Sequence, residues 1–133
     1  MIEESYYRTS VKAVIYNENW EILLCKEDSW KYDFPGWWLD HWEKIEDCLK
    51  RELKEEMWIE IISFNKTPKE FIAFYDDESK KHPLRTNVFY EVKVKNLDFK
   101  PSEECVSIWF FNKETVKNIK SYKSVYEFFE NLT

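Results

Sequence analysis

Residues 37–59 read WWLDHWEKIEDCLKRELKEEMWI and hold the clearest helical pattern in the chain. Neither proline nor glycine interrupts residues 45–57. Apolar residues recur there at every fourth position: Ile45, Leu49, Leu53 and Met57. This spacing predicts an amphipathic helix over 45–57 with one face directed into a core.

Three carboxylates lie close to the apolar face of this predicted helix. On a helix that turns by about 100° per residue, Glu52 and Glu56 point within roughly 20° of Ile45, and Glu55 lies about 80° away. Like charges three or four positions apart repel one another. Carboxylates are also rarely buried without a partner. The segment therefore needs a source of positive charge.

Two sources of positive charge fit the residues. Basic side chains can neutralise the carboxylates, and Arg51, four positions before Glu55, is placed to do so. Alternatively, the carboxylate oxygens hold a hard divalent cation. Lys50 and Lys54 point to the opposite side of the helix, which favours the cation.

The spacing of the segment resembles the signature of a known family. The pattern Trp37-x5-Glu43-x7-Arg51-Glu52-Leu53-x-Glu55-Glu56-x-Trp58-Ile59 is similar to the Nudix box, G-x5-E-x7-R-E-U-x-E-E-x-G-U, in which U is a bulky aliphatic residue. Every charged and aliphatic position is filled, and only the two box glycines differ, both being tryptophan. The flanking segments Phe34-Pro35-Gly36 and Glu104-x4-Trp109-Phe110 resemble family segments as well.

The resemblance implies an α+β fold, in which a mixed β-sheet is sandwiched between helices and a loop-helix-loop carries the box. We expect residues 1–133 to form a single domain of this kind. The implied activity is divalent-metal-dependent hydrolysis of a nucleoside diphosphate linked to another group. The small size of the chain favours a nucleoside triphosphate pyrophosphohydrolase of the housecleaning type. ADP-ribose, dinucleoside polyphosphates and capped RNA ends stay open as substrates.

The resemblance also implies roles for individual residues. Glu52, Glu55 and Glu56 would be ligands of Mg²⁺ or Mn²⁺, together with the Gly36 carbonyl. Glu43 and Arg51 would pair and brace the loop against the helix. A carboxylate outside the box would act as a ligand or as the general base. Glu104 is the first candidate for this role, and its neighbour Glu103 is the second. For the substrate phosphates we expect contacts from two basic residues, Lys81 and Arg85.

The composition of the chain restricts the kinds of molecule that it can bind. The 20 basic and 26 acidic residues give a net charge of −6, which does not suit polymeric nucleic acid. A phosphorylated small molecule remains compatible if a divalent cation bridges the like charges. No apolar run approaches the length of a membrane span, and the acidic N-terminus does not resemble a signal peptide. Three cysteines without a CxxC indicate free thiols and a cytoplasmic protein, which would be a monomer or a homodimer.

Alternation and turn residues outline the other elements. Strands are expected at residues 8–16, 21–26, 59–64, 71–75, 87–94 and 107–111. The first two strands should form a hairpin across an Asn-rich turn. Two more helices are expected at 113–119 and 124–132, and loops at 27–42 and 97–104.

The tryptophans are abnormal in number and in position. A chain of this length is expected to hold roughly nine glycines, but it contains one glycine and seven tryptophans. Six tryptophans occupy turn, loop or box positions where the backbone favours glycine: Trp20, Trp30, Trp37, Trp38, Trp42 and Trp58. Only Trp109 lies in an apolar strand. The pattern suggests a gene whose UGA codons mean glycine in its own organism and were read here as tryptophan. Deliberate replacement of glycine, or native tryptophans that pack or stack on a base, are the alternatives.

A second class of function competes with the enzyme. A Nudix-like domain can bind a nucleotide or a partner without turnover, and a loop filled with tryptophans favours that reading. The three retained glutamates favour an enzyme, because a site without a cation has no reason to keep repelling charges together. If the chain is made as written, we expect weak metal binding and little activity.

Overall fold

The computed structural model describes residues 6–39 and 42–132. The acidic N-terminal residues 1–5, on which the expected absence of a signal peptide rests, lie outside this range. In the part of the chain that is described, no helix is long and apolar enough to cross a membrane.

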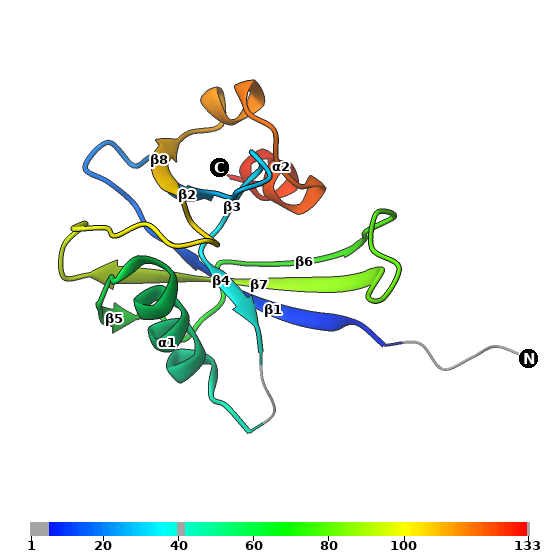
Figure 1. Cartoon of the computed structure of the whole chain (residues 1–133), viewed down its shortest axis with the longest axis horizontal. Helices are drawn as coiled ribbons and strands as arrows, with labels where there is room; N and C mark the ends of the chain where they lie inside the picture. The colour runs from blue at the N-terminus through cyan, green and yellow to red at the C-terminus, as the bar shows by residue number, and fades with distance from the viewer. Residues whose placement is uncertain (1–5, 40–41, 133) are drawn as a thin grey trace, which may run out of the picture.

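Five strands form the larger sheet, in the order β4-β1-β7-β5, with β6 also paired to β7 (Figure 1). Strands β1 and β7 run parallel, with Arg8 opposite Arg85 and Val14 opposite Glu91, and the other pairs are antiparallel. The sheet is therefore mixed, as expected. Its members are β1 (Arg8–Val14), β4 (Gly36–Trp38), β5 (Ile61–Phe64), β6 (Glu70–Tyr75) and β7 (Leu84–Val94).

A smaller antiparallel sheet has the order β3-β2-β8. Its strands are β2 (Ile22–Lys26), β3 (Tyr32–Asp33) and β8 (Ser107–Phe111). Successive side chains of β2 point to opposite sides, so that Leu23 enters one apolar core and Leu24 the other. The small sheet thereby contributes to both cores.

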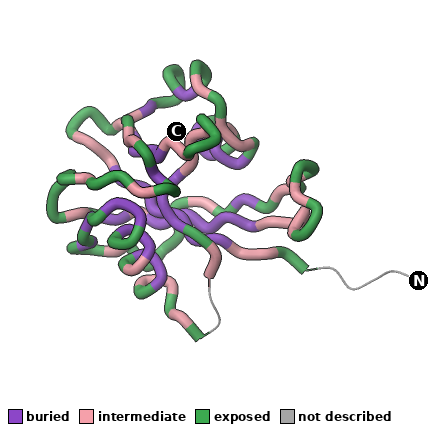
Figure 2. The backbone as a smooth tube through the Cα atoms, viewed as in Figure 1, coloured by how far each residue is buried: buried purple, intermediate pink, exposed green. Residues whose placement is uncertain are grey.

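Two helices cover the larger sheet from opposite sides: α1 (Ile45–Met57) and α2 (Lys123–Glu130). Val11 and Ala13 of β1 share a core with α1, whereas Val14 shares a core with Phe128 of α2. Figure 1 shows the strands between these helices, and Figure 2 shows that the buried residues concentrate where the layers meet. The α+β sandwich that the resemblance implied is therefore present.

Several sequence-based boundaries are confirmed and others are wrong. Helix 45–57 and strand 107–111 have the expected bounds, and residues 97–104 form no strand or helix. Residues 113–119 form only a short 3₁₀ turn, η1 (Thr115–Asn118). The segment 27–42 was expected to be a loop, but it contains β3 and β4 because its backbone pairs with β2 and β1.

The expected hairpin between the first two strands is confirmed only around its turn, where the Asn17 N–H donates to the Glu21 carbonyl and the Leu23 N–H donates to the Ile15 carbonyl. Strands β1 and β2 enter different sheets and meet only near their connection, where Tyr16 pairs with Ile22. The turn itself is held by the Asn17 side chain, whose oxygen accepts hydrogen bonds from the N–H groups of Asn19 and Glu21. After this turn β2 departs to pair with β8, so the two layers separate at this point.

Candidate active site

Helix α1 positions the acidic residues and ends abruptly. Trp58, directly after the helix, has φ 61° and ψ 28°, which is the left-handed conformation typical of a helix C-terminus. Its N–H donates to the Lys54 carbonyl at 3.0 Å, and the Ile59 N–H donates to the Leu53 carbonyl at 3.3 Å. These bonds satisfy the last carbonyls and turn the chain back toward β5. The helix is thus held at both its buried face and its end.

Three carboxylates converge beside this helix. Glu52 and Glu56 are each only 5% exposed, and Glu104 approaches from the loop before β8. One oxygen from each of the three residues lies within 4.8 Å of the other two. Carboxylate oxygens at this separation form a suitable ligand set for a hard divalent cation.

The site is electrostatically unfavourable when it holds only carboxylates. Burial raises the pKa of the Glu56 carboxyl to about 9; the Lys12 ammonium opposes this shift, and Glu104 adds to it. Burial also raises the pKa of Glu52, while Arg51 lowers it. Burial of the two glutamates thus disfavours the charged forms that would bind a cation. A positive ion between the oxygens would remove this penalty.

Arg51 links the loop before the helix to the carboxylate cluster. Its Nε and Nη2 atoms donate to the two Glu43 oxygens at 2.8 and 2.9 Å, so the expected brace is present. Its Nη1 atom donates to Glu52 at 2.6 Å and to Glu55 at 3.3 Å. The guanidinium lowers the pKa of the Glu43 carboxyl through these hydrogen bonds.

Glu55 does not join the close group of three carboxylates. Its side chain is 60% exposed and lies against Arg51. Glu104, expected as the carboxylate from outside the box, lies within the group. Its neighbour Glu103 is exposed and, like Glu104, lines the cavity beside the carboxylates.

The carboxylate cluster opens into a cavity of about 450 Å³, which we call the acidic cavity. Glu56, Glu104 and Gly36 line it, so the glycine expected as a ligand borders the same cavity as two of the carboxylates. Gly36 has φ 134°, and a Cβ atom there would lie 2.0 Å from the Val11 carbonyl oxygen. Only glycine fits this close approach of β4 to β1.

The two expected phosphate-binding residues lie apart from the carboxylates. Arg85 lines a separate cavity, pairs with Asp76 at 3.4 Å and donates to the His82 carbonyl oxygen. Lys81 is exposed in the loop between β6 and β7 and lines neither cavity. The structure therefore brings neither residue to the carboxylate cluster.

Sequence reasoning missed a partly buried charged pair beside the site. Lys12 is 5% exposed, and its ammonium lies 3.0 Å from the Asp33 carboxylate. Glu27 lies near this pair and accepts hydrogen bonds from the Tyr122 hydroxyl at 2.7 and 2.9 Å. The available signal was Lys12 within residues 11–15, whose other members are apolar. Its strand was recognised, but its half-buried partner Asp33 lay in a segment expected to be a loop.

This fold and this acidic helix define the class of the protein. The NUDIX domain family matches residues 6–132, nearly the whole chain, and the chain belongs to that family. Among curated proteins, an RNA pyrophosphohydrolase from Ruthia magnifica subsp. Calyptogena magnifica is 36% identical over 88 residues, or 62% of this chain. The match covers 48% of that relative, so it spans about half of the relative's length.

Solved structures share the fold over most of the chain. The MutT protein from Methanosarcina mazei Go1 has a TM-score of 0.78 and 22% identity, and covers 97% of this chain and 94% of its own. The E. coli ORF135 protein has a TM-score of 0.73 and 17% identity, with coverages of 93% and 86%. An ADP-ribose pyrophosphatase from Streptococcus suis 89-1591 has a TM-score of 0.60 and 27% identity, with coverages of 82% and 76%.

Proposed function

We propose that this chain is a divalent-cation-dependent hydrolase of diphosphate bonds, and that its substrate is a nucleoside triphosphate. The observation that carries the proposal is the group of Glu52, Glu56 and Glu104, whose oxygens lie within 4.8 Å of one another. Membership of the NUDIX family supports the reaction class. Mg²⁺ or Mn²⁺ is the cation that carboxylate oxygens suit.

The residues fit such a cation by their chemistry. Two of the three carboxylates are buried, and burial disfavours their charged forms. Holding them together without positive charge is unfavourable. In our proposal Glu55 leaves Arg51 and joins the ligands, because its side chain is exposed and lies one helical turn from Glu52. The Gly36 carbonyl supplies a further oxygen at the cavity wall.

The chain's own residues then have defined tasks. A divalent cation bound here would neutralise charge on the diphosphate and lower the pKa of an attacking water. Glu52 orients that water and accepts its proton. Arg51 fixes the Glu52 carboxylate by its 2.6 Å hydrogen bond and ties it to Glu43. Helix α1 thus fixes the orientation of the base relative to the ligands.

An RNA with a 5′-triphosphate is the second candidate substrate. It is favoured by the 36% identity to a protein named RNA pyrophosphohydrolase. The net charge of −6 opposes it, because long-range repulsion weakens binding of a polyanion. ADP-ribose and dinucleoside polyphosphates would use the same carboxylates. Binding without turnover is the remaining alternative, in which the carboxylates hold a cation but no nucleotide is cleaved.

A screen that separates and quantifies the pyrophosphate and nucleotide products tests the reaction. The written chain is compared with a glycine variant in which six tryptophans are replaced by glycine: Trp20, Trp30, Trp37, Trp38, Trp42 and Trp58. The substrates are nucleoside triphosphates, ADP-ribose, dinucleoside polyphosphates and 5′-triphosphorylated RNA, each with Mg²⁺. We expect the glycine variant to release pyrophosphate from a nucleoside triphosphate faster than the written chain does.

Two substitutions in the glycine variant serve as test and control. Glu56→Gln removes a charged ligand without changing shape, and we expect turnover to fall by about a hundredfold or more. Glu60→Gln changes an exposed glutamate outside the cavity and should leave turnover unchanged. Equal losses in both variants, or turnover that survives complete removal of metal by a chelator, would contradict the proposal.

A further inference from the structure

Buried polar side chains outside the carboxylate cluster gather at one place. Apart from Glu52 and Glu56, five polar or charged residues in the described part of the chain are buried: Ser10, Lys12, Thr86, Asn87 and Ser124. All of them except Thr86 line a single cavity of about 330 Å³, which we call the polar cavity. Burying polar groups is unfavourable unless they find partners. Lys12 finds its partner in Asp33, and Asn87 in Ser124. The remaining donors and acceptors of Ser10, Asn87 and Ser124 offer hydrogen bonds to a polar ligand that enters the cavity.

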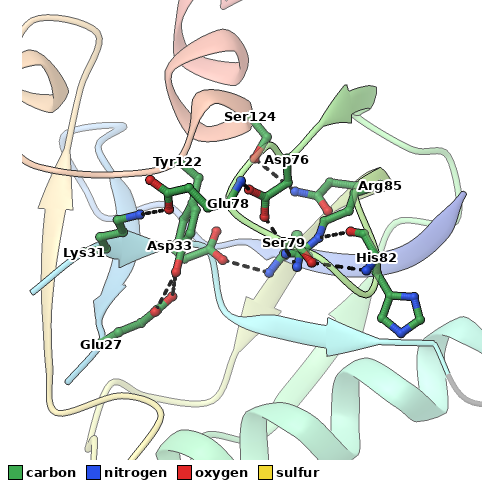
Figure 3. Close-up of polar contacts among 12 residues, drawn as sticks. Glu27, Lys31, Asp33, Asp76, Glu78, Ser79, His82, Arg85, Tyr122 and Ser124 are labelled. Atoms are coloured by element: carbon green, nitrogen blue, oxygen red, sulfur yellow. Dashed lines mark hydrogen bonds and ion pairs between the residues drawn. The ribbon is translucent and has the colours of Figure 1, made fainter. Parts of the chain in front are cut away.

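The polar cavity is built from three elements. Ser10 on β1 lies directly opposite Asn87 on β7, and Ser124 stands at the start of α2. The Asn87 amide nitrogen donates to the Ser124 hydroxyl oxygen at 3.2 Å. Figure 3 shows the groups from β3, the β6–β7 loop and the start of α2 drawn toward one another around this region. An amide and two hydroxyls at one cavity wall can form hydrogen bonds with the edge of a polar heterocycle.

Aromatic and cationic groups complete the polar cavity. Phe74 and Tyr122 line it beside the polar residues. Arg85 also lines it and is fixed by Asp76 and by the His82 carbonyl. Flat apolar surfaces beside hydrogen-bonding groups suit a planar base better than they suit a sugar.

The polar cavity adjoins the acidic cavity. Glu27, Asp33 and Trp37 line both of them. The charged residues Lys12 and Arg85 that line the polar cavity are already paired with Asp33 and Asp76. A planar polar end therefore suits the polar cavity, and an anionic end that needs a cation suits the acidic cavity. A nucleotide has this construction, with its base and its phosphates separated by a ribose.

We propose that the polar cavity binds the base of a mononucleotide whose phosphates lie at Glu52, Glu56 and Glu104. The proposal rests on the proposed function, and it makes Asn87 and Ser124 the residues that determine base specificity. A nucleoside triphosphate then gains affinity from its own base, without contacts to a following nucleotide.

Calorimetric titrations with α,β-methylene nucleoside triphosphates of the four bases test this assignment. Inorganic tripolyphosphate is the ligand without a base, and all titrations contain Mg²⁺ and use both the written chain and the glycine variant. We expect Asn87→Ala and Ser124→Ala to weaken binding of the preferred nucleotide by about tenfold, the loss typical of one or two hydrogen bonds. Tripolyphosphate should bind unchanged. Thr86→Ala, a buried control on the same strand that lines neither cavity, should affect neither ligand.

The outcomes separate this proposal from the reaction itself. Nucleotide binding that depends on Asn87 without any hydrolysis would overturn the proposed function and leave the base site standing. Equal weakening of nucleotide and tripolyphosphate, or no weakening of either, would overturn the base site. Tighter, Asn87-dependent binding of 5′-triphosphorylated RNA would overturn the assignment to mononucleotides.

A separate observation concerns the tryptophans. Among the described residues other than glycine, positive φ occurs at four positions, and all four are tryptophan: Trp20 (60°), Trp30 (72°), Trp42 (69°) and Trp58 (61°). This region is unfavourable for residues with a Cβ atom and easy for glycine. All four residues are mostly exposed. Trp20 contacts the Tyr16 ring, and the ammonium groups of Lys26 and Lys100 lie over Trp30 and Trp58, so only surface contacts oppose the strain.

We infer that the natural protein has glycine at these four positions and at Trp37 and Trp38. For Trp37 the reason is its place at a glycine of the box, and for Trp38 it is the adjoining position in the same loop. Neither of these two has positive φ, although both follow Gly36, whose φ is 134°, in strand β4. Trp109 differs from all six, since it lies in strand β8 away from any turn. Reading of UGA as glycine in the source organism explains the whole set.

The gene and the native protein decide this inference. We expect UGA at the six codons, UGG at Trp109, and glycine at the six sites in peptides of the protein from its own organism. UGG codons at the six sites, or tryptophan in the native peptides, would overturn it. In urea unfolding, the four replacements at positive φ made together should raise the midpoint, whereas Trp109→Gly should lower it. A lowered midpoint for the four would contradict the conformational argument.

Discussion

The Lys12 ammonium lies 3.0 Å from the Asp33 carboxylate, and this partly buried pair joins two strands that belong to different sheets. Lys12 lines the polar cavity, and Asp33 lines both cavities. The Lys12 charge also lowers the pKa of Glu56, against the rise that burial causes. The pair therefore connects the packing of the two sheets with the electrostatics of the acidic site.

Replacing Lys12 by methionine should destabilise the fold. The change keeps the length of the side chain but leaves the Asp33 carboxylate without its partner, and such losses cost about 3 kcal/mol. We expect the free energy of unfolding in urea to fall by about this amount. Replacing Asp33 by asparagine in the same chain should recover part of the loss. If the double variant is as unstable as the sum of the two single variants, the pair is not coupled.

Arg51→Lys should show that geometry matters as well as charge. Lysine keeps the positive charge but cannot make two parallel hydrogen bonds to Glu43 while also bonding Glu52. We expect a loss of stability of about 1 to 2 kcal/mol and weaker metal binding. Lys54→Arg, an exposed change on the same helix, is the matched control and should alter neither quantity. Unchanged metal affinity in Arg51→Lys would rule out the bracing role.

Gly36→Ala should prevent correct pairing of β4 with β1. The added Cβ would meet the Val11 carbonyl oxygen, and the φ of 134° is unfavourable for any other residue. We expect a loss of at least about 2 kcal/mol in unfolding free energy and no measurable metal binding. Circular dichroism and urea titration measure the first effect, and calorimetry measures the second. A stable Gly36→Ala protein with normal metal affinity would show that this approach is not required.

Stability should depend on pH through Glu56 when metal is absent. Burial raises the folded pKa of Glu56 to about 9, above its ordinary value of 4.5, so between these two values the folded protein binds a proton that the unfolded chain has released. The free energy of unfolding should therefore fall as pH rises across this window. Glu56→Gln should flatten that dependence in urea titrations with a chelator present. A wild-type slope that persists in Glu56→Gln would assign the effect to other groups.

The sequence was sufficient for the elements that carry their own periodicity. Helix 45–57 has its apolar residues at helical spacing, and the neighbouring charged residues match a recognised pattern, so both its bounds and the Glu43–Arg51 pair were predictable. The strand at 107–111 is a continuous apolar run and was also found. Local signals of this kind do not depend on which partner each element meets.

The rest depended on contacts that are distant in sequence. Strands β3 and β4 are two and three residues long, and only pairing with β2 and β1 makes them strands. The expected hairpin is confined to its turn because β2 then pairs with β3 and with β8, the latter some eighty residues later. The polar cavity likewise combines β1, β7 and α2, so no local pattern in the sequence indicated it.

Titration of the metal-free glycine variant with Mn²⁺, followed by calorimetry and by electron paramagnetic resonance, tests the central claim most directly. We expect saturable binding that Mg²⁺ displaces, that Glu56→Gln and Glu104→Gln each weaken at least tenfold, and that Glu60→Gln leaves unchanged. The absence of saturable Mn²⁺ uptake in a folded glycine variant, or uptake that is indifferent to both Glu56→Gln and Glu104→Gln, would contradict the account.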